Sequence, residues 1–393
     1  MDTLGIYVQV PFCASKCSFC NFSSKVAPAS VFDEYCTALE REITGLPQSL
    51  AAEGITHEVC DLMVDTLYFG GGTPSLLGAE RLHRLVHALR GRFRISDITE
   101  FTIEVTPGSA DNSFCSQAFA LGFNRLSIGA QSFIDAELST TGRLHTAEET
   151  GCLIHAVRQA GFRNISLDLI AGLPFQTEES WQHSVAQALG FRPEHISIYL
   201  FEIDEKSRLG AEVLKGGGHY HATSVPSDDF MAAAYQWAVK FLGAAGYQQY
   251  EISNFALPGF ESRHNQKYWQ LRPYLGLGAG AHSYNGIQRW ANESVVEKYQ
   301  EIVARKESPI ATNKKLSTVE QVEEFFFLGL RQKGGVDLAQ ARRQWGKAAL
   351  GPWETRIAAM HEDGLVIRQM DRIFLPEDAY LVSNEIFQEF LLA

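Results

Sequence analysis

Short runs of β-branched and apolar residues recur along the first half of the chain, and each is followed by a loop rich in Gly, Pro or polar residues. These runs predict strands at residues 5–10, 64–69, 100–105, 125–129, 165–170 and 195–201. Helical patterns separate them, most clearly one apolar face formed by Leu82, Leu85, Val86, Leu89 and Phe93. Alternating strands and helices predict α/β architecture, specifically a partial (β/α)6 barrel within residues 1–225.

The pattern changes after the last of these strands. A polar, Gly-rich stretch at 215–226 predicts a closing loop, and residues 226–312 are interpreted as a connecting region that begins with a helix at 229–242. Residues 313–393 predict a winged-helix-like, mainly helical C-terminal domain with a hairpin at 365–375. That domain carries 10 basic and 12 acidic residues, so a structural or docking role is favoured over DNA binding.

Charge and composition narrow the functional classes. The 393 residues include 34 Lys and Arg against 46 Asp and Glu, a net charge of −12 that disfavours nucleic acid as a partner. No apolar run approaches the roughly 20 residues of a transmembrane segment. The first residues have neither the basic region nor the apolar region of a signal peptide, so we expect a cytoplasmic protein.

Three of the seven cysteines, Cys13, Cys17 and Cys20, follow the first predicted strand in a C-x3-C-x2-C motif. They could form one face of a helix or bind zinc. A structural zinc site takes four ligands, and the next Cys and His are Cys36 and His57, so the local set is one ligand short. A cubane cluster accepts three thiolates and leaves one iron open. The motif therefore predicts a [4Fe-4S] cluster, with a zinc-bound scaffold as the weaker alternative.

Polar residues and glycines also follow the other predicted strands. A GGGTP run at 70–74 allows backbone groups to approach a ligand closely. Each polar residue alone could be a satisfied buried group. Because the carboxyl ends of parallel strands meet at one rim, together they predict a ligand site. The polar residues at this rim are Glu104, Gln131, Arg143 and Asp168.

The cysteine motif, with an aromatic residue before its last Cys and YxxxPFC ahead of it, resembles the radical S-adenosylmethionine (SAM) superfamily. The resemblance is to the branch related to oxygen-independent coproporphyrinogen III oxidase. It implies a cluster whose open iron chelates the methionine moiety of SAM. It further implies that the residues in contact with SAM are Tyr7, Phe19, Gly71, Gly72, Thr73, Glu104, Gln131, Arg143 and Asp168.

Two features separate the members of this branch. Phe22 stands where the oxidases carry a fourth Cys, and an HNxxYW motif at 264–269 resembles the haem chaperones. The resemblance implies that His264 binds haem, with His282 as a second candidate ligand. It also implies a haem-acceptor protein and an electron donor, both unidentified, and a monomer or haem-linked dimer. The alternative is an enzyme whose SAM-derived radical attacks a tetrapyrrole, as in the oxidase or haem-degrading methyltransferases.

Overall fold

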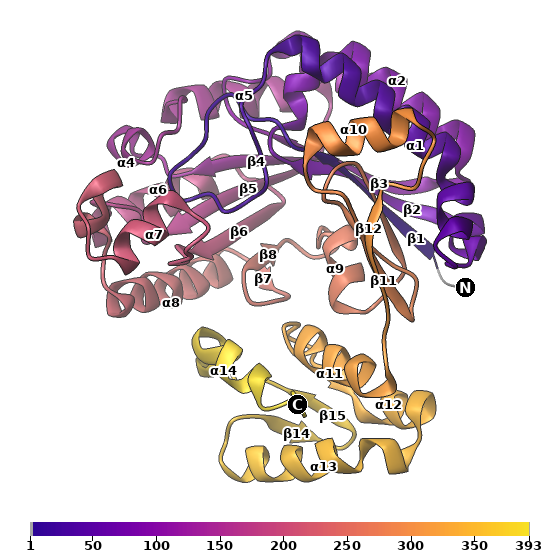
Figure 1. Cartoon of the computed structure of the whole chain (residues 1–393). Coiled ribbons are helices and arrows are strands. Elements are labelled where there is room, and N and C mark those ends of the chain that lie inside the picture. Colours follow the sequence, from indigo (N-terminus) through magenta and orange to yellow (C-terminus); the bar gives the residue numbers. More distant parts are fainter. Residues whose placement is uncertain (1–2, 393) are drawn as a thin grey trace.

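A computed structural model describes residues 3–392 of the chain. Its centre is a sheet of strands in the order β12-β11-β10-β9-β1-β2-β3-β4-β5-β6-β8-β7. The parallel strands from β1 to β6 curve into a partial barrel (Figure 1), which confirms the predicted α/β architecture. They are β1 (Thr3–Val10), β2 (Met63–Gly71), β3 (Ile95–Val105), β4 (Arg125–Gln131), β5 (Asn164–Ala171) and β6 (His195–Leu200).

Helices cover the outer face of this curved sheet (Figure 1). The longer ones are α1 (Ala29–Ala52), α2 (Gly78–Arg92), α3 (Asn112–Leu121), α5 (Ala147–Ala160), α6 (Glu178–Gly190) and α8 (Asp228–Ala244). Shorter ones are η1 (His57–Asp61), η2 (Pro74–Leu77), α4 (Asp135–Thr140), α7 (Arg208–Leu214) and η3 (His219–Ser224).

Alternation along the strands separates an apolar shell from a polar lumen. On β4, Leu126 and Ile128 are fully buried in the hydrophobic core beneath the helices. Ser127 and Gln131 face the opposite way and line a cavity. Because neighbouring side chains point to opposite faces of a strand, the same pattern places polar groups inside the barrel on β2, β3, β5 and β6.

The segment after α8 adds short strands at both edges of the sheet. Beyond β6, β8 (Asn254–Ala256) pairs with β6 in antiparallel orientation, and β7 (Gln248–Gln249) pairs with β8 in the same way. On the other side, β9 (Tyr274–Leu277) runs parallel to β1. The sheet then continues antiparallel through β10 (His282–Tyr284), β11 (Gln288–Asn292) and β12 (Ile310–Lys315). The helices of this segment are α9 (Arg263–Trp269) and α10 (Val296–Ala304).

The C-terminal elements pack around a separate core that contains Phe326, Trp353 and Phe390. The helices are α11 (Thr318–Gly329), α12 (Leu338–Trp345), α13 (Lys347–Glu362), η4 (Glu377–Val382) and α14 (Ser383–Gln388). A small sheet joins β13 (Val336–Asp337), β15 (Arg372–Phe374) and β14 (Ile367–Gln369). The helices and hairpin agree with the expected mainly helical domain. Among residues 3–392, no helix has the length and apolar character needed to cross a membrane.

Candidate functional site

A pocket of about 780 Å³ opens at the carboxyl ends of the parallel strands. Every residue that the sequence assigns to the cluster or to SAM lines this pocket. These residues are Tyr7, Cys13, Cys17, Phe19, Cys20, Gly71, Gly72, Thr73, Glu104, Gln131, Arg143 and Asp168. The parallel sheet therefore brings together positions from its first five strands and the loops that follow them.

The cysteines lie on the loop between β1 and α1, and backbone hydrogen bonds hold this loop against the rest of the rim. The amide of Cys13 donates to the carbonyl of Lys25 at 3.0 Å. The amide of Ser18 donates to the carbonyl of Thr141 at 2.9 Å, and its own carbonyl accepts from the amide of Leu209 at 2.8 Å. The loop is thus tied to segments after β4 and β6, on the opposite side of the pocket.

The thiols fit an iron–sulfur cluster better than a single metal ion. Within residues 3–392, no group of three or more His, Cys, Asp or Glu side chains is gathered closely enough to hold one ion. In a cubane each thiolate binds a different iron, so thiols that line one pocket without converging suit it. Thr73 Oγ1 lies 3.9 Å from Cys13 Sγ, and Arg143 Nη1 lies 3.7 Å from Cys17 Sγ. From these positions both groups can stabilise negative charge on the sulfur atoms.

The glycines after β2 are required by the close approach of two chain segments. Gly71 has a φ of 109°, in the region that favours glycine. A Cβ at Gly72 would lie 2.4 Å from the carbonyl oxygen of Phe12, directly before the cysteine motif. The amide of Thr73 donates to that same carbonyl at 2.7 Å. The glycine loop and the cysteine loop therefore form one continuous wall of the pocket.

Glu104, near the end of β3, presents a carboxylate to the pocket. Its Oε1 accepts a hydrogen bond from the Tyr68 hydroxyl at 2.7 Å, and its Oε2 accepts one from the amide of Gly71 at 3.0 Å. Burial raises the pKa of Glu104 to about 7, although both hydrogen bonds oppose this change. A bound ammonium group would favour the ionised form, so ligand binding and ionisation of Glu104 are coupled near neutral pH.

The remaining polar residues complete the other side of the pocket. Asp168 on β5 accepts a hydrogen bond from the Ser127 hydroxyl at 3.4 Å, and burial raises its pKa. Gln131 ends β4 with a φ of 66°, a left-handed conformation that is uncommon for a side chain of this type. Arg143 donates from Nη2 to the carbonyl of Gly129. This bond directs its guanidinium toward the cysteine loop.

Like the second candidate His282, the predicted haem ligand His264 lies apart from this pocket. Its ring is 1% exposed, near the amino ends of the strands. Nδ1 lies 2.9 Å from Thr66 Oγ1, and Nε2 lies 2.8 Å from the hydroxyl of Tyr268 on the same helix. Burial lowers the pKa of His264 to about 3, so the ring is neutral. Both ring nitrogens thus have hydroxyl partners in this structure, and the role of His264 as a haem ligand stays a prediction.

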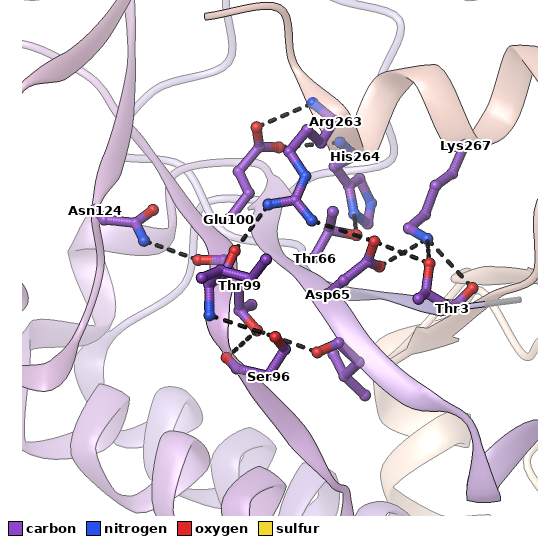
Figure 2. Close-up of polar contacts among 12 residues, drawn as sticks. Thr3, Asp65, Thr66, Ser96, Thr99, Glu100, Asn124, Arg263, His264 and Lys267 are labelled. Atoms are coloured by element: carbon purple, nitrogen blue, oxygen red, sulfur yellow. Dashed lines mark hydrogen bonds and ion pairs between the residues drawn. The ribbon is translucent and has the colours of Figure 1, made fainter. Parts of the chain in front are cut away.

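Polar side chains around His264 close the amino end of the barrel, and we call this region the floor. Glu100 on β3 accepts hydrogen bonds from the amides of Arg263 and His264, both at 2.9 Å (Figure 2). The Lys267 ammonium pairs with Asp65 at 2.7 Å and donates to Thr3 Oγ1 at 2.9 Å (Figure 2). These bonds attach α9 to the first strands of the sheet.

Sequence reasoning missed several residues of the lumen. Tyr199 and Glu202, at and after the end of β6, line the pocket. Arg125, the first residue of β4, is 2% exposed inside the barrel. An alternating strand places Tyr199 on the same face as other lumen residues. Arg125 could have been found from the sequence, because it is the only charged residue of a strand that is otherwise uncharged.

Comparison with known proteins agrees with this architecture. The model of the radical SAM superfamily matches residues 7–188, and that of the HemN C-terminal domain matches residues 316–382. The solved structure of coproporphyrinogen III oxidase (HemN) from Escherichia coli has a TM-score of 0.85. It is 24% identical, and the match covers 100% of this chain and 90% of that one. These matches define a radical SAM fold with a HemN-type C-terminal domain.

Curated relatives narrow the family further. The heme chaperone HemW of Bacillus subtilis is 34% identical over 386 residues, which cover 98% of each chain. HemW of Lactococcus lactis is 32% identical over 386 residues, which cover 98% of this chain and 97% of the relative. The chain belongs to the HemW family of the radical SAM superfamily. The superfamily implies a [4Fe-4S] cluster and SAM, and the chemistry of the pocket fits both.

Proposed function

We propose that this protein is a cytoplasmic haem chaperone that binds a [4Fe-4S] cluster and SAM in the main pocket and transfers haem to an acceptor protein. The observation that carries the proposal is the assembly of the predicted cluster and SAM residues around one pocket. The names of the relatives supply the haem function. In this proposal the acceptor is a protein, and no nucleic acid or transmembrane segment takes part.

Different residues of the pocket bind the cluster and SAM. Cys13, Cys17 and Cys20 hold the cluster as thiolates. Backbone N–H and C=O groups of the glycine loop donate hydrogen bonds to SAM and accept hydrogen bonds from it, and the Glu104 carboxylate accepts them from its ammonium group. The planar guanidinium of Arg143 pairs with the carboxylate of SAM. SAM bound to a reduced cluster supplies radical chemistry, and the alternative function would use it on a tetrapyrrole.

The HNxxYW motif supports haem binding, because two of its residues line a cavity. Trp269 and Gln266 line a second cavity of about 530 Å³, whose other residues include Phe325 and Arg372 of the C-terminal domain. A flat indole beside this cavity suits the face of a porphyrin. His264 lies at the inner end of the motif and is already bonded at both ring nitrogens. We therefore place haem on the outer side of α9.

A single reaction separates a chaperone from an enzyme. Anaerobically reconstituted protein is incubated with SAM, a reductant and either haem or coproporphyrinogen III, and tetrapyrrole masses and 5′-deoxyadenosine are measured. We expect haem to be recovered unaltered and bound to the protein, with no turnover of coproporphyrinogen III. A methylated, opened or decarboxylated tetrapyrrole formed with SAM cleavage would overturn the chaperone and establish the alternative.

A further inference from the structure

Arg125 is a buried cation without a direct counter-ion. It is 2% exposed, and within residues 3–392 its guanidinium forms no hydrogen bond or ion pair; its Nε is buried without a partner. An isolated charge buried in a low-dielectric interior is unfavourable unless other charges compensate for it. The position of Arg125 in the barrel shows which charges can do so.

The register of the sheet places Arg125 below the carboxylates of the main pocket. Arg125 lies opposite Thr102 on β3, and Ser127, on the same face of β4, lies opposite Glu104. Ser127 donates a hydrogen bond to Asp168. Since alternate residues of a strand share a face, Arg125 faces the same lumen as Glu104 and Asp168, one layer closer to the floor.

The other titratable groups of the lumen do not compete with Arg125 for these carboxylates. Those whose pKa the charge of Arg125 affects are Tyr68, His195, Tyr250 and His264. Burial raises the pKa of each tyrosine and lowers that of each histidine, so all are neutral. Arg143 is held by the Gly129 carbonyl and faces Cys17. Arg125 therefore acts on both Glu104 and Asp168. The third buried carboxylate on this face of β3, Glu100, is held by the amides of Arg263 and His264, and the Lys267 ammonium is paired with Asp65.

We propose that Arg125 is a positioning residue that favours the ionised forms of Glu104 and Asp168 and thereby raises the affinity of the pocket for cationic SAM. It acts through these carboxylates and does not touch the ligand. The positive charge of Arg125 opposes the rise that burial imposes on the pKa of both groups. Without it, two carboxylates share a low-dielectric lumen, and one takes up a proton more readily. This inference rests on the proposed binding of SAM.

Arg125→Met and Arg125→Lys test the role of the charge. SAM affinity of anaerobically reconstituted protein is measured by equilibrium dialysis between about pH 6 and about pH 9. In the wild type we expect affinity to rise with pH to a plateau above the pKa of Glu104, which is about 7. In Arg125→Met the rise shifts upward by about one pH unit, so affinity falls about fivefold at pH 7, up to about tenfold at lower pH, and recovers at high pH. Arg125→Lys keeps the wild-type profile.

The double variant Glu104→Gln with Arg125→Met shows whether Arg125 acts through Glu104. We expect Arg125→Met to shift the pH profile much less when residue 104 cannot ionise. An equal loss of affinity at every pH, or a profile identical to the wild type, would overturn the proposal. If Arg125→Met does not fold, Arg125→Gln removes the charge while retaining polar groups and gives the same test. Absence of SAM binding to the wild type would instead overturn the proposed function.

Discussion

The two ends of the barrel are both polar, yet they use their polar groups differently. At the floor, Glu100 accepts two amide hydrogen bonds and both nitrogens of His264 have partners. At the mouth, Glu104 and Asp168 face a pocket, and Gln131 has a left-handed backbone. Polar burial alone therefore does not identify a binding site. A site is indicated where polar groups retain access to a cavity and the backbone is locally strained.

The largest expected effect is at the cysteine loop of the mouth. Cys13→Ala, Cys17→Ala and Cys20→Ala should each abolish the brown chromophore of anaerobically reconstituted protein, because three thiolates are the minimum local ligand set for the cluster. The absorption spectrum and the iron and sulfide content check this. Cys152→Ala is the matched control, since Cys152 is exposed and outside the pocket, and it should keep full colour. A retained chromophore in all three variants would exclude the cluster.

Two glutamates on β3 provide a matched comparison of mouth and floor. Glu104→Gln should weaken SAM binding by about 10- to 100-fold, because a hydrogen bond to a charged group contributes about 1.5–3 kcal/mol. It should also remove the pH dependence of binding near pH 7. Equilibrium dialysis with reconstituted protein checks both effects. Unchanged affinity in Glu104→Gln would show that this carboxylate does not contact SAM.

The floor member of the pair should behave in the opposite way. Glu100→Gln should leave SAM affinity unchanged but lower the free energy of unfolding by about 1–3 kcal/mol. The reason is that the two carboxylate oxygens accept hydrogen bonds from the Arg263 and His264 amides, whereas the single amide oxygen of Gln can accept only one of them in the same way. Denaturant unfolding monitored by circular dichroism measures the change. A loss of SAM affinity without a loss of stability would contradict the distinction between the two ends.

His264 gives a smaller and more specific effect. His264→Gln should leave the Soret band of the haem-loaded protein unchanged and lower stability by about 1 kcal/mol for each lost hydrogen bond. His282→Gln is the comparison, because His282 is exposed at the start of β10. A Soret shift in His264→Gln would mean that α9 opens and releases Nε2 from Tyr268. A shift in His282→Gln would assign the iron ligand to that imidazole.

A further effect at the mouth is the pH dependence of stability in protein without SAM. The folded pKa of Glu104 is about 7, above its usual value of 4.5. A raised folded pKa means that stabilisation is complete below the unfolded pKa and is lost as pH rises through the folded value. The wild type should therefore lose stability between about pH 4.5 and pH 7 relative to Glu104→Gln. Thermal melts of both proteins across this range check the sign.

The long strands and the rim of the barrel could be predicted from local patterns. Alternation over five or more residues identified β1 to β6, and the carboxyl ends of parallel strands necessarily meet at one edge. The short edge strands escaped prediction, because β7 spans Gln248–Gln249 and β10 spans His282–Tyr284. Such lengths show no periodicity, and their pairing with β8 and β9 is a tertiary property.

The environment of a single side chain was harder to predict than its position in a motif. The HNxxYW sequence does not reveal that α9 turns His264 toward Thr66 and Trp269 toward the C-terminal domain. One face of this seven-residue helix thus contacts the floor, and another face lines a separate cavity. Likewise, only the three-dimensional register shows that Arg125 lies below Glu104 and Asp168.

The pairing of β1 has a consequence for synthesis of the chain. This first strand lies between β2 and β9, so its second neighbour is Tyr274–Leu277. At roughly 5–20 residues per second, translation needs on the order of 15–50 s to pass from one to the other. During that interval the cysteine loop has left the ribosome while one side of β1 still lacks its partner. The sheet around β1 is therefore complete only after Tyr274–Leu277 has been synthesised, late in translation.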